Sequence, residues 1–521
     1  MSPALSARLD RVIADLPQAY PGPGGAVAVV KDGQVLVRHA WGFANAELRI
    51  PFTPRSLFRM CSITKQFTCA AMLDAVPDPA ALDDAVRAQL PRLEGPAPAA
   101  AHLAHNQSGL RDYWAVAMLL GAPAESPFGD HESRLVIGAT RDLQFAPGTR
   151  FSYSNNNFRI LSDALEGRTG RSFAEILRTR IFDRVGMETA LLAADTRAMP
   201  DGSEGYEGSV ATGFRPAENR ILWTGDAGLG ASLDDMIAWE RYIDATRDDP
   251  DSLYGRISAP VSFADGATAS YGYGLARGVD RGRAFTAHGG ALRGWRSNRI
   301  HLPAERLSVV VLLNHLSPAH LAVAAVVDAV LDAAPAPPRP ETPPPGWLGA
   351  WHEPETGLAL RAEAAGPGQV RVMFGHSPEL LDLQPDGSAS SAGMALVPEG
   401  GGLWLERAGD HLRSRLTPLP QGPGRLDVAG HYHCEALDAG LTLADAGGAL
   451  YGAFSGALGR GRMEQLAPVA ADVWALPCPR ALDHTPPGDW TLAVRRDGTG
   501  RVAEIMVGCW LARNLAYRRV A

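Results

Sequence analysis

Alternating and apolar runs lie near both ends of the first 334 residues. Residues 25–30 and 35–40 are rich in Val and Ala and are joined by the turn-forming pair Asp32-Gly33, which predicts a β-hairpin. Stretches rich in Ala and Leu follow and predict helices, and a strand pattern returns at 307–314. We therefore expect one large domain of mixed helix and sheet over residues 1–334.

A proline-rich segment separates this domain from the rest. Seven prolines fall between positions 335 and 345. Closely spaced prolines resist both helices and sheet ladders and behave as a stiff spacer. Residues 335–345 are therefore predicted to be a linker.

After the linker the pattern changes to short alternating runs separated by Gly, Pro and Asp. The runs stand at 370–374, 402–406, 449–454 and 490–495. This pattern predicts two small all-β units, over 346–417 and 418–521. The phrase that begins Gly349-Ala350-Trp351 recurs, with one extra residue in each gap, as Gly430-His431-Tyr432. The recurrence favours a duplicated barrel.

Composition narrows the function classes. With 46% hydrophobic and 20% charged residues the chain can bury a large core, which excludes a disordered or fibrous protein. The net charge of −8 argues against polyanionic partners, so no nucleic acid is expected. No apolar run approaches the roughly 20 residues of a membrane-spanning helix, and the first residues lack the apolar centre of a secretory signal. We expect no membrane association and a cytoplasmic location.

The five cysteines fit neither a disulfide framework nor a zinc site. They stand at Cys61, Cys69, Cys434, Cys478 and Cys509, without a C-x-x-C pair. Reduced thiols are the simpler interpretation. No histidine group has convincing ligand spacing and no phosphate-binding loop is present, so neither a metal nor another cofactor is predicted.

A serine and a lysine three positions apart form the first candidate motif. Only two of the 49 basic residues are lysines, and Lys65 follows Ser62 at the start of a helix-like run. The helical repeat places both side chains on one face. A lysine whose pKa is depressed by burial can take the proton of a serine hydroxyl, and helix N–H groups can stabilise the developing oxyanion. The alternative is an exposed pair on a helix surface.

A second candidate segment adds a phenol and an amide. Tyr153 and Asn155 follow a turn; Tyr153 could relay a proton to a leaving amine, and Asn155 could bond both a substrate amide and Lys65. Taken alone, this segment is more often a simple turn.

A histidine followed by two glycines stands later in the chain. His288, Gly289 and Gly290 would let a substrate backbone approach a strand edge, and the amide of Ala291 could be a second oxyanion donor beside that of Ser62. A lone histidine before glycines is usually a loop residue. The three signals in this order are stronger together than each is alone.

These motifs resemble those of the penicillin-recognising serine hydrolases, which include class C β-lactamases, DD-peptidases and esterases. Ser62-Ile63-Thr64-Lys65 is similar to the first motif of that family, Tyr153-Ser154-Asn155 to the second, and His288-Gly289-Gly290 stands at the third. The third motif usually starts with lysine, which holds a substrate carboxylate. Histidine here therefore argues against a substrate with a free C-terminal carboxylate at that position.

His-Gly-Gly and the two C-terminal units extend the resemblance to the bacterial D-aminopeptidases of this family. It implies a β-lactamase-like catalytic domain, with an antiparallel sheet, flanking helices and a helical subdomain, followed by two antiparallel eight-stranded β-barrels. It also implies that a loop of the last barrel, 479–489, reaches the active site, where Asp483 contributes to substrate binding, either by contact with the ammonium of a peptide N-terminus or by shaping the pocket.

The resemblance implies a serine aminopeptidase that removes N-terminal D-residues from short peptides, amides and esters through an acyl-enzyme on Ser62. Lys65 would be the base and Tyr153 would assist proton transfer. β-Lactams are possible inhibitors, and a homodimer is expected. Two alternatives remain: an esterase or β-lactamase-like hydrolase with the same residues, and a non-catalytic receptor that binds peptides.

Overall fold

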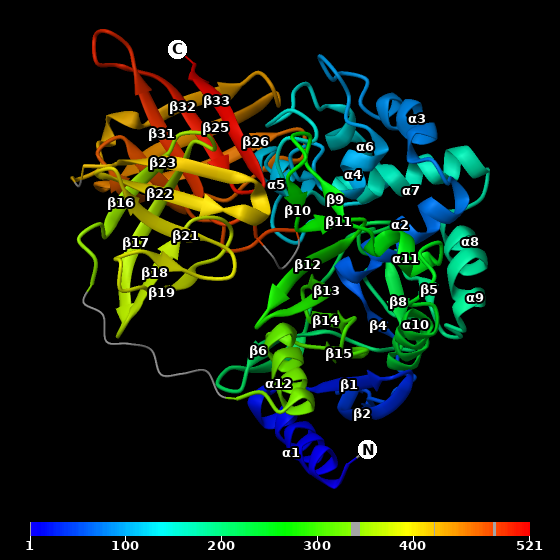
Figure 1. The fold of residues 1–521 in the computed structure, drawn as a ribbon. Helices are drawn as coiled ribbons and strands as arrows, with labels where there is room; N and C mark the ends of the chain where they lie inside the picture. The colour runs from blue at the N-terminus through cyan, green and yellow to red at the C-terminus, as the bar shows by residue number, and fades with distance from the viewer. Residues whose placement is uncertain (1, 335–343, 421, 483–485, 521) are drawn as a thin grey trace.

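The computed structural model describes residues 2–334, 344–420, 422–482 and 486–520. The chain forms a large N-terminal domain and two β units, which lie side by side against one flank of that domain (Figure 1). The predicted multidomain architecture is confirmed. Most of the predicted linker, 335–345, lies outside the described residues.

An antiparallel sheet forms the centre of the N-terminal domain. Its strand order is β11-β12-β13-β14-β15-β1-β2-β3. The strands are β1 (Gly24–Lys31), β2 (Gln34–Asn45), β3 (Ile50–Pro51), β11 (Tyr271–Gly272), β12 (Leu275–Asp280), β13 (Arg283–Leu292), β14 (Trp295–Leu302) and β15 (Leu307–Leu313). The predicted hairpin and the strand near 307–314 are both present, and β1 pairs with β15, so the two ends of the domain meet in the sheet.

The sheet has a core on each face. In β1, Val27 and Val29 face a core formed with α1 and α12, whereas Ala26 and Ala28 face the larger core of the domain. Alternate residues of a strand point to opposite faces, so a strand buried on both faces is apolar throughout. The helices are α1 (Pro3–Ala19), α2 (Thr64–Ala75), α3 (Asp83–Ala88), α4 (Ala100–Ala104), α5 (Tyr113–Leu119), α6 (Asp130–Gly138), α7 (Asn155–Thr169), α8 (Phe173–Leu177), α9 (Asp183–Val185), α10 (Leu233–Ala245), α11 (Leu253–Ser258) and α12 (Ala319–Leu331).

The first β unit is a closed antiparallel barrel. It runs through eight strands, and its last strand pairs with its first. The strands are β16 (Gly349–Glu353), β17 (Leu358–Gly366), β18 (Gln369–Met373), β19 (Glu379–Leu383), β20 (Ala389–Ser390), β21 (Ala395–Glu399), β22 (Gly402–Arg407) and β23 (Leu412–Pro418). This barrel has the strand number that the family resemblance implies.

The second β unit is antiparallel but follows a more open path. Its sheet of ten strands has the order β27-β26-β25-β24-β33-β32-β31-β30-β29, with β28 beside β26, and within the described residues it forms a half-barrel. The strands are β24 (Gly430–Cys434), β25 (Ala439–Ala446), β26 (Ala449–Gly456), β27 (Gly459–Arg460), β28 (Glu464–Gln465), β29 (Ala467–Ala470), β30 (Val473–Leu476), β31 (Trp490–Arg496), β32 (Val502–Cys509) and β33 (Ala512–Arg519).

The recurring phrase of the sequence forms the same element in both units. The two copies become the hairpins β16–β17 and β24–β25, each the first hairpin of its unit. Each first strand also pairs with the last strand of its own unit. The sequence repeat therefore corresponds to the first hairpin of each β unit.

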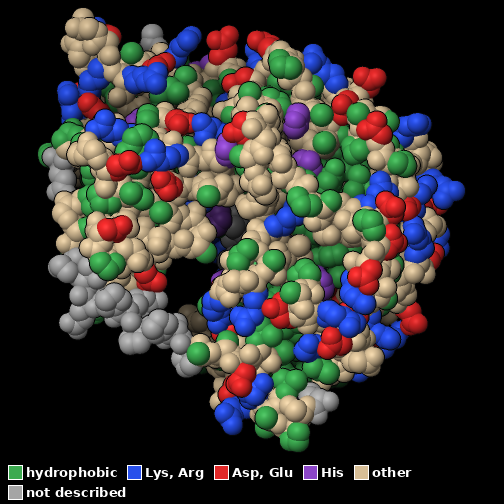
Figure 2. All heavy atoms as spheres, in the orientation of Figure 1, with side chains coloured by type: hydrophobic (Ala, Val, Ile, Leu, Met, Phe, Trp, Pro, Cys, Tyr) green, Lys and Arg blue, Asp and Glu red, His purple; other side chains and the backbone are tan. Residues whose placement is uncertain are grey.

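Both β units touch the N-terminal domain through specific bonds. The Asp112 amide donates to the Leu511 carbonyl at 3.0 Å, and the Phe151 amide donates to the Asp410 carbonyl at 3.3 Å. Acidic and basic side chains are interspersed over the face that Figure 2 shows, and the surface is hollowed where the β units meet the domain. Among the described residues no helix is both long and apolar enough to cross a membrane.

Candidate active site

Ser62 lies in a tight turn that leads directly into α2. The turn is a short 3-10 helix, Cys61–Ile63, and Cys61 at its start has a left-handed backbone with φ of 51°. Such a conformation is costly for a residue with a side chain and is found at functional sites. Ser62 is half-buried, so its hydroxyl can be reached from a cavity.

Strand β13 packs directly against this turn. A Cβ atom on Gly290 would stand 2.3 Å from the Met60 carbonyl oxygen and 2.2 Å from Ser297 Oγ. Real Cβ contacts are never that short, so only glycine fits at this position. The close approach brings the edge at Ala291 beside Ser62, as expected of two amides that share an oxyanion.

Lys65 is fully buried on the first turn of α2. Its Nζ lies 3.1 Å from Ser62 Oγ, 2.9 Å from Asn155 Oδ1 and 2.7 Å from the carbonyl oxygen of Asp226. A neutral amine has two N–H donors and one lone pair. The amide and carbonyl oxygens can only accept, whereas the serine hydroxyl can also donate. The three N–H groups of a charged amine can thus reach all three oxygens, whereas a neutral amine would leave its lone pair for the Ser62 hydroxyl.

Asn155 is oriented by a buried carboxylate that the motif analysis did not include. Asp112 Oδ2 accepts from Asn155 Nδ2 at 2.9 Å and from the Asn155 amide at 2.7 Å. These bonds fix the side-chain amide so that Oδ1 faces Lys65. Burial raises the pKa of Asp112, while the donated N–H bonds and the nearby Lys65 charge oppose the rise. None of the three motifs of the sequence analysis includes Asp112.

Tyr153 lies next to Lys65, with the lysine Nζ 4.9 Å from the centre of its ring. The backbone after it is held by Asn106, whose Oδ1 accepts from the Ser154 amide at 3.1 Å and from Asn157 Nδ2 at 2.9 Å. Asn106 therefore supports the backbone of the second motif.

His288 is buried and its hydrogen bonds define its tautomer. Nδ1 lies 2.6 Å from the Gly289 carbonyl, which can only accept, so Nδ1 carries the proton. Nε2 then accepts from the Tyr271 hydroxyl at 3.0 Å. Burial, together with the Lys65 charge, lowers the pKa of His288 to about 3, so the ring is neutral near pH 7. A neutral ring does not replace the lysine charge of the usual third motif.

The predicted residues meet in one cavity of about 680 Å³. The N-terminal domain contributes Ser62, Asp112, Phe151, Tyr153, Asn155, His288, Gly289, Gly290 and Ala291 to its wall. The β units contribute His376, Arg407, Asp410, Pro487, Trp510 and Leu511. The volume is typical of small-molecule sites. Sequence reasoning missed the contribution of the first barrel.

Asp483, the residue expected to bind a substrate ammonium, lies outside the described residues, as does part of the loop 479–489. The described start of the loop is tied to the catalytic strand: Arg293, just after β13, donates to the Ala481 carbonyl at 2.9 Å. Pro487, at the other end, lines the cavity.

The comparisons with known proteins agree with this architecture. A family model described as "Beta-lactamase" matches residues 9–333, and one described as "D-aminopeptidase, domain B" matches 340–518. A protein named D-aminopeptidase from Gluconobacter oxydans is 58% identical over 100% of both chains, and one of the same name from Brucella canis is 46% identical over 98% of both.

The chain belongs to the D-aminopeptidase family. The resemblance that the motifs suggested is thereby confirmed, and with it the serine hydrolase class.

Solved structures related to this D-aminopeptidase family member share its fold. The octameric penicillin-binding protein homologue from Pyrococcus abyssi is 22% identical, with a TM-score of 0.53 over 79% of this chain and 99% of that one. A crystal structure of SurE is 19% identical, with a TM-score of 0.52 over 99% of this chain and 100% of that one. At these identities the likeness concerns the fold alone.

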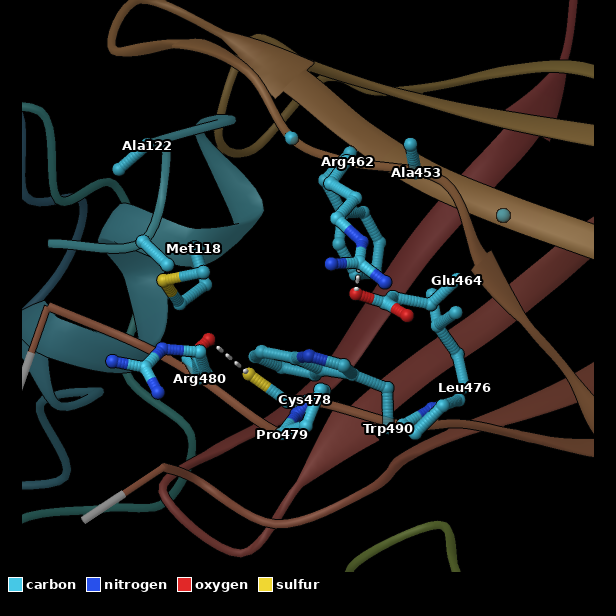
Figure 3. A pocket seen from close by; sticks show the side chains of 15 residues that line it. Met118, Ala122, Ala453, Arg462, Glu464, Leu476, Cys478, Pro479, Arg480 and Trp490 are labelled. Carbon is cyan, nitrogen blue, oxygen red and sulfur yellow. Dashed lines mark hydrogen bonds and ion pairs between the residues drawn. The ribbon is translucent and has the colours of Figure 1, made fainter. Parts of the chain in front are cut away.

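A second, smaller cavity of about 120 Å³ lies between the N-terminal domain and the second β unit (Figure 3). Met118, Cys478 and Trp490 line it, and the Cys478 thiol donates to the Arg480 carbonyl at 3.7 Å. Burial raises the pKa of Cys478 to about 12, so the thiol is not a nucleophile near neutral pH. This cavity is part of a packed interface.

The described residues contain no group of three or more His, Cys, Asp or Glu side chains that could hold a metal ion. The groups around Ser62 that can take part in chemistry include a hydroxyl, an amine, a phenol and backbone amides.

Proposed function

We propose that this protein is a serine aminopeptidase that hydrolyses N-terminal D-residues from short peptides, amides and esters. The observation that carries the proposal is the 3.1 Å contact between Ser62 Oγ and the buried Lys65 Nζ, in the cavity that the three units enclose. The names of the relatives supply the substrate class.

In the first step Ser62 Oγ attacks the carbonyl carbon that follows the D-residue, and its proton passes to Lys65 Nζ. The carbonyl π bond becomes an oxyanion, which the amides of Ser62 and Ala291 stabilise. Lys65 is suited to this task because its other two polar partners only accept hydrogen bonds.

The tetrahedral intermediate then collapses and the bond to the leaving amine breaks. Tyr153 relays a proton to that amine, and the phenol is replenished from the Lys65 ammonium next to it. Water attacks the resulting ester by the same route in reverse, which releases the D-residue and restores Ser62.

Substrate recognition rests on the strand edge and the loop. Gly289 and Gly290 let the substrate backbone approach β13, and the neutral His288 lines the site. We also assign Asp483 to substrate binding, because a carboxylate is a suitable partner for the α-ammonium of a peptide N-terminus. When amine and carbonyl are both anchored, an L-residue directs its side chain into the wall, so the site prefers the D-enantiomer.

Cytoplasmic location and a homodimer complete the proposal. All five cysteines are free and buried, as expected of a protein from a reducing compartment. The homodimer rests on the family resemblance.

The test compares D-alanine and L-alanine p-nitroanilides. We expect the full chain to hydrolyse only the D-enantiomer appreciably, and Ser62→Ala to abolish the reaction while the protein stays folded. Equal rates for both enantiomers would contradict the stereochemical assignment. Rapid turnover of benzylpenicillin with D-alanine amide left intact would favour a β-lactamase-like hydrolase. If binding is the only measurable function and Ser62→Ala leaves it unchanged, the result would favour a receptor.

A further inference from the structure

The first β-barrel supplies a charged patch to the wall of the catalytic cavity. Arg407, at the end of β22, and Asp410, in the turn before β23, both line it. The Arg407 guanidinium lies 4.6 Å from the centre of the Trp510 indole, which belongs to the second β unit. The catalytic mechanism uses none of these residues.

Asp410 is held so that one of its carboxylate oxygens remains available. Its side chain is 10% exposed, and Oδ2 accepts from Arg407 Nε at 2.5 Å. Oδ1 has no hydrogen-bond partner within the described residues. The carboxylate therefore has a fixed orientation in the cavity wall and one unused acceptor.

The positive charge beside Asp410 has a second acidic partner. Arg407 also donates to Glu379 Oε1 at 3.0 Å, so one guanidinium is shared between two carboxylates. Arg296 also lines the cavity and donates to the carbonyl oxygens of Leu292 and Trp295 at 2.8 Å. Arg513 is fully buried and packs on the Trp510 ring with its guanidinium carbon 4.1 Å from the ring centre. It does not line the cavity. Burial raises the pKa of Asp410, and an incoming cation offsets that desolvation.

The position of Asp410 indicates which part of a substrate it meets. The Phe151 amide donates to the Asp410 carbonyl oxygen at 3.3 Å, and Phe151 stands two residues before Tyr153. Tyr153 is the group assigned to the leaving amine. Asp410 therefore lies on the side of the cavity where the leaving portion of the peptide departs.

We propose that Asp410 binds a cationic side chain, such as that of lysine or ornithine, in the residue after the scissile bond. The first barrel is then a specificity subsite for basic leaving groups. This inference rests on the proposed aminopeptidase function and deepens it, because it names the class of peptide that the enzyme prefers.

Three dipeptides test the subsite: D-alanyl-lysine, D-alanyl-Nε-acetyl-lysine and D-alanyl-glutamate. Acetylation removes the charge of the lysine side chain and keeps its length. We expect kcat/KM to be about tenfold higher for the lysine than for the acetyl-lysine peptide, which corresponds to about 1.4 kcal/mol, and lowest for the glutamate peptide. The preference should weaken at high salt.

Two variants assign the preference to Asp410. In Asp410→Asn the lysine to acetyl-lysine ratio should fall close to one. Asp265→Asn is the matched control: Asp265 is a 60% exposed carboxylate that accepts from His411, the neighbour of Asp410, and it does not line the catalytic cavity. Asp265→Asn should keep the wild-type ratio.

Several results would overturn the proposal. A wild-type ratio near one excludes the subsite without any variant. A preference for the glutamate peptide would indicate that Arg407 binds an anionic side chain instead. An unchanged ratio in Asp410→Asn would place the recognition elsewhere. None of these results bears on the aminopeptidase function itself, which hydrolysis of D-alanine p-nitroanilide decides.

Discussion

The two walls of the catalytic cavity are built in different ways. The inner wall belongs entirely to the N-terminal domain, and its groups are fixed by several short contacts each: Lys65 alone meets Ser62, Asn155 and the Asp226 carbonyl within 3.1 Å. The outer wall is assembled from both β units, which meet where Arg407 lies over Trp510.

The two walls carry groups of different kinds: catalytic groups on the inner wall, and groups that can contact the rest of a substrate on the outer wall. The inner wall holds a nucleophile, a base and amide donors, which any acyl substrate needs. The outer wall holds a carboxylate, a guanidinium and an indole, which can only discriminate among substrates. On the proposed function, the barrels therefore add to the substrate selection that β13 makes, and the chemistry belongs to the N-terminal domain.

The largest expected effect comes from disturbing the inner wall at Gly290. In Gly290→Ala the new methyl group would meet the Met60 carbonyl oxygen at 2.3 Å, which must displace the Ser62 turn from β13. Misplacing a catalytic group by about 1 Å can cost about 100-fold in rate. We expect kcat for D-alanine p-nitroanilide to fall by about that factor.

The neighbouring glycine provides the matched control. In Gly289→Ala the nearest atom to the new methyl group is Asn298 Nδ2, the end of a side chain, at 3.3 Å. Circular dichroism should show both variants folded. At saturating substrate kcat should fall far less in Gly289→Ala, where a methyl group at the substrate-binding edge is expected to raise KM instead. Equal kcat values in the two variants would show that the contact between β13 and the nucleophile turn has no catalytic importance.

A smaller effect concerns the stability of the N-terminal domain in acid. Burial lowers the pKa of His105 and His288 to about 3, and that of His301 and His315 to about 4. An unfolded histidine has a pKa near 6.5, so the unfolded chain binds protons that the folded domain excludes. The free energy of unfolding should therefore be constant above about pH 7 and fall as the pH drops from about 6.5 toward 4.

The expected slope is at most about 1.4 kcal/mol per pH unit for each histidine. Urea denaturation at pH 7.5, 6 and 5 measures it. A midpoint that does not move between pH 7.5 and 5 would contradict the burial of these rings as neutral species.

The sequence could point to the residues of the inner wall because their signals are local. Ser62 and Lys65 share one helical turn, and Tyr153 and Asn155 stand two residues apart, so short-range geometry already places each pair. His288 and the two glycines after it predicted a strand edge, which is part of β13. Asp112 was missed because its bonds to Asn155 arise only when α5 and α7 pack together.

The residues of the outer wall do not form a comparable local motif in the sequence. Nothing in the sequence around Arg407, Asp410 and Trp510 indicates that these residues meet. Their meeting depends on how two β units dock on a third domain, which no periodicity or spacing encodes. The open path of the second unit is likewise a matter of long-range pairing, whereas the alternation of its strands was visible in the sequence.

The central claim is that Lys65 activates Ser62, and the two lysines of this chain allow a direct test. The measurement is the pre-steady-state burst of p-nitrophenol from D-alanine p-nitrophenyl ester, which reports formation of the acyl-enzyme. Lys31→Met, at a partly exposed site that pairs with Asp32, should acylate at the wild-type rate. Lys65→Met should acylate about 1000-fold more slowly. Acylation by Lys65→Met at the rate of Lys31→Met would contradict the account.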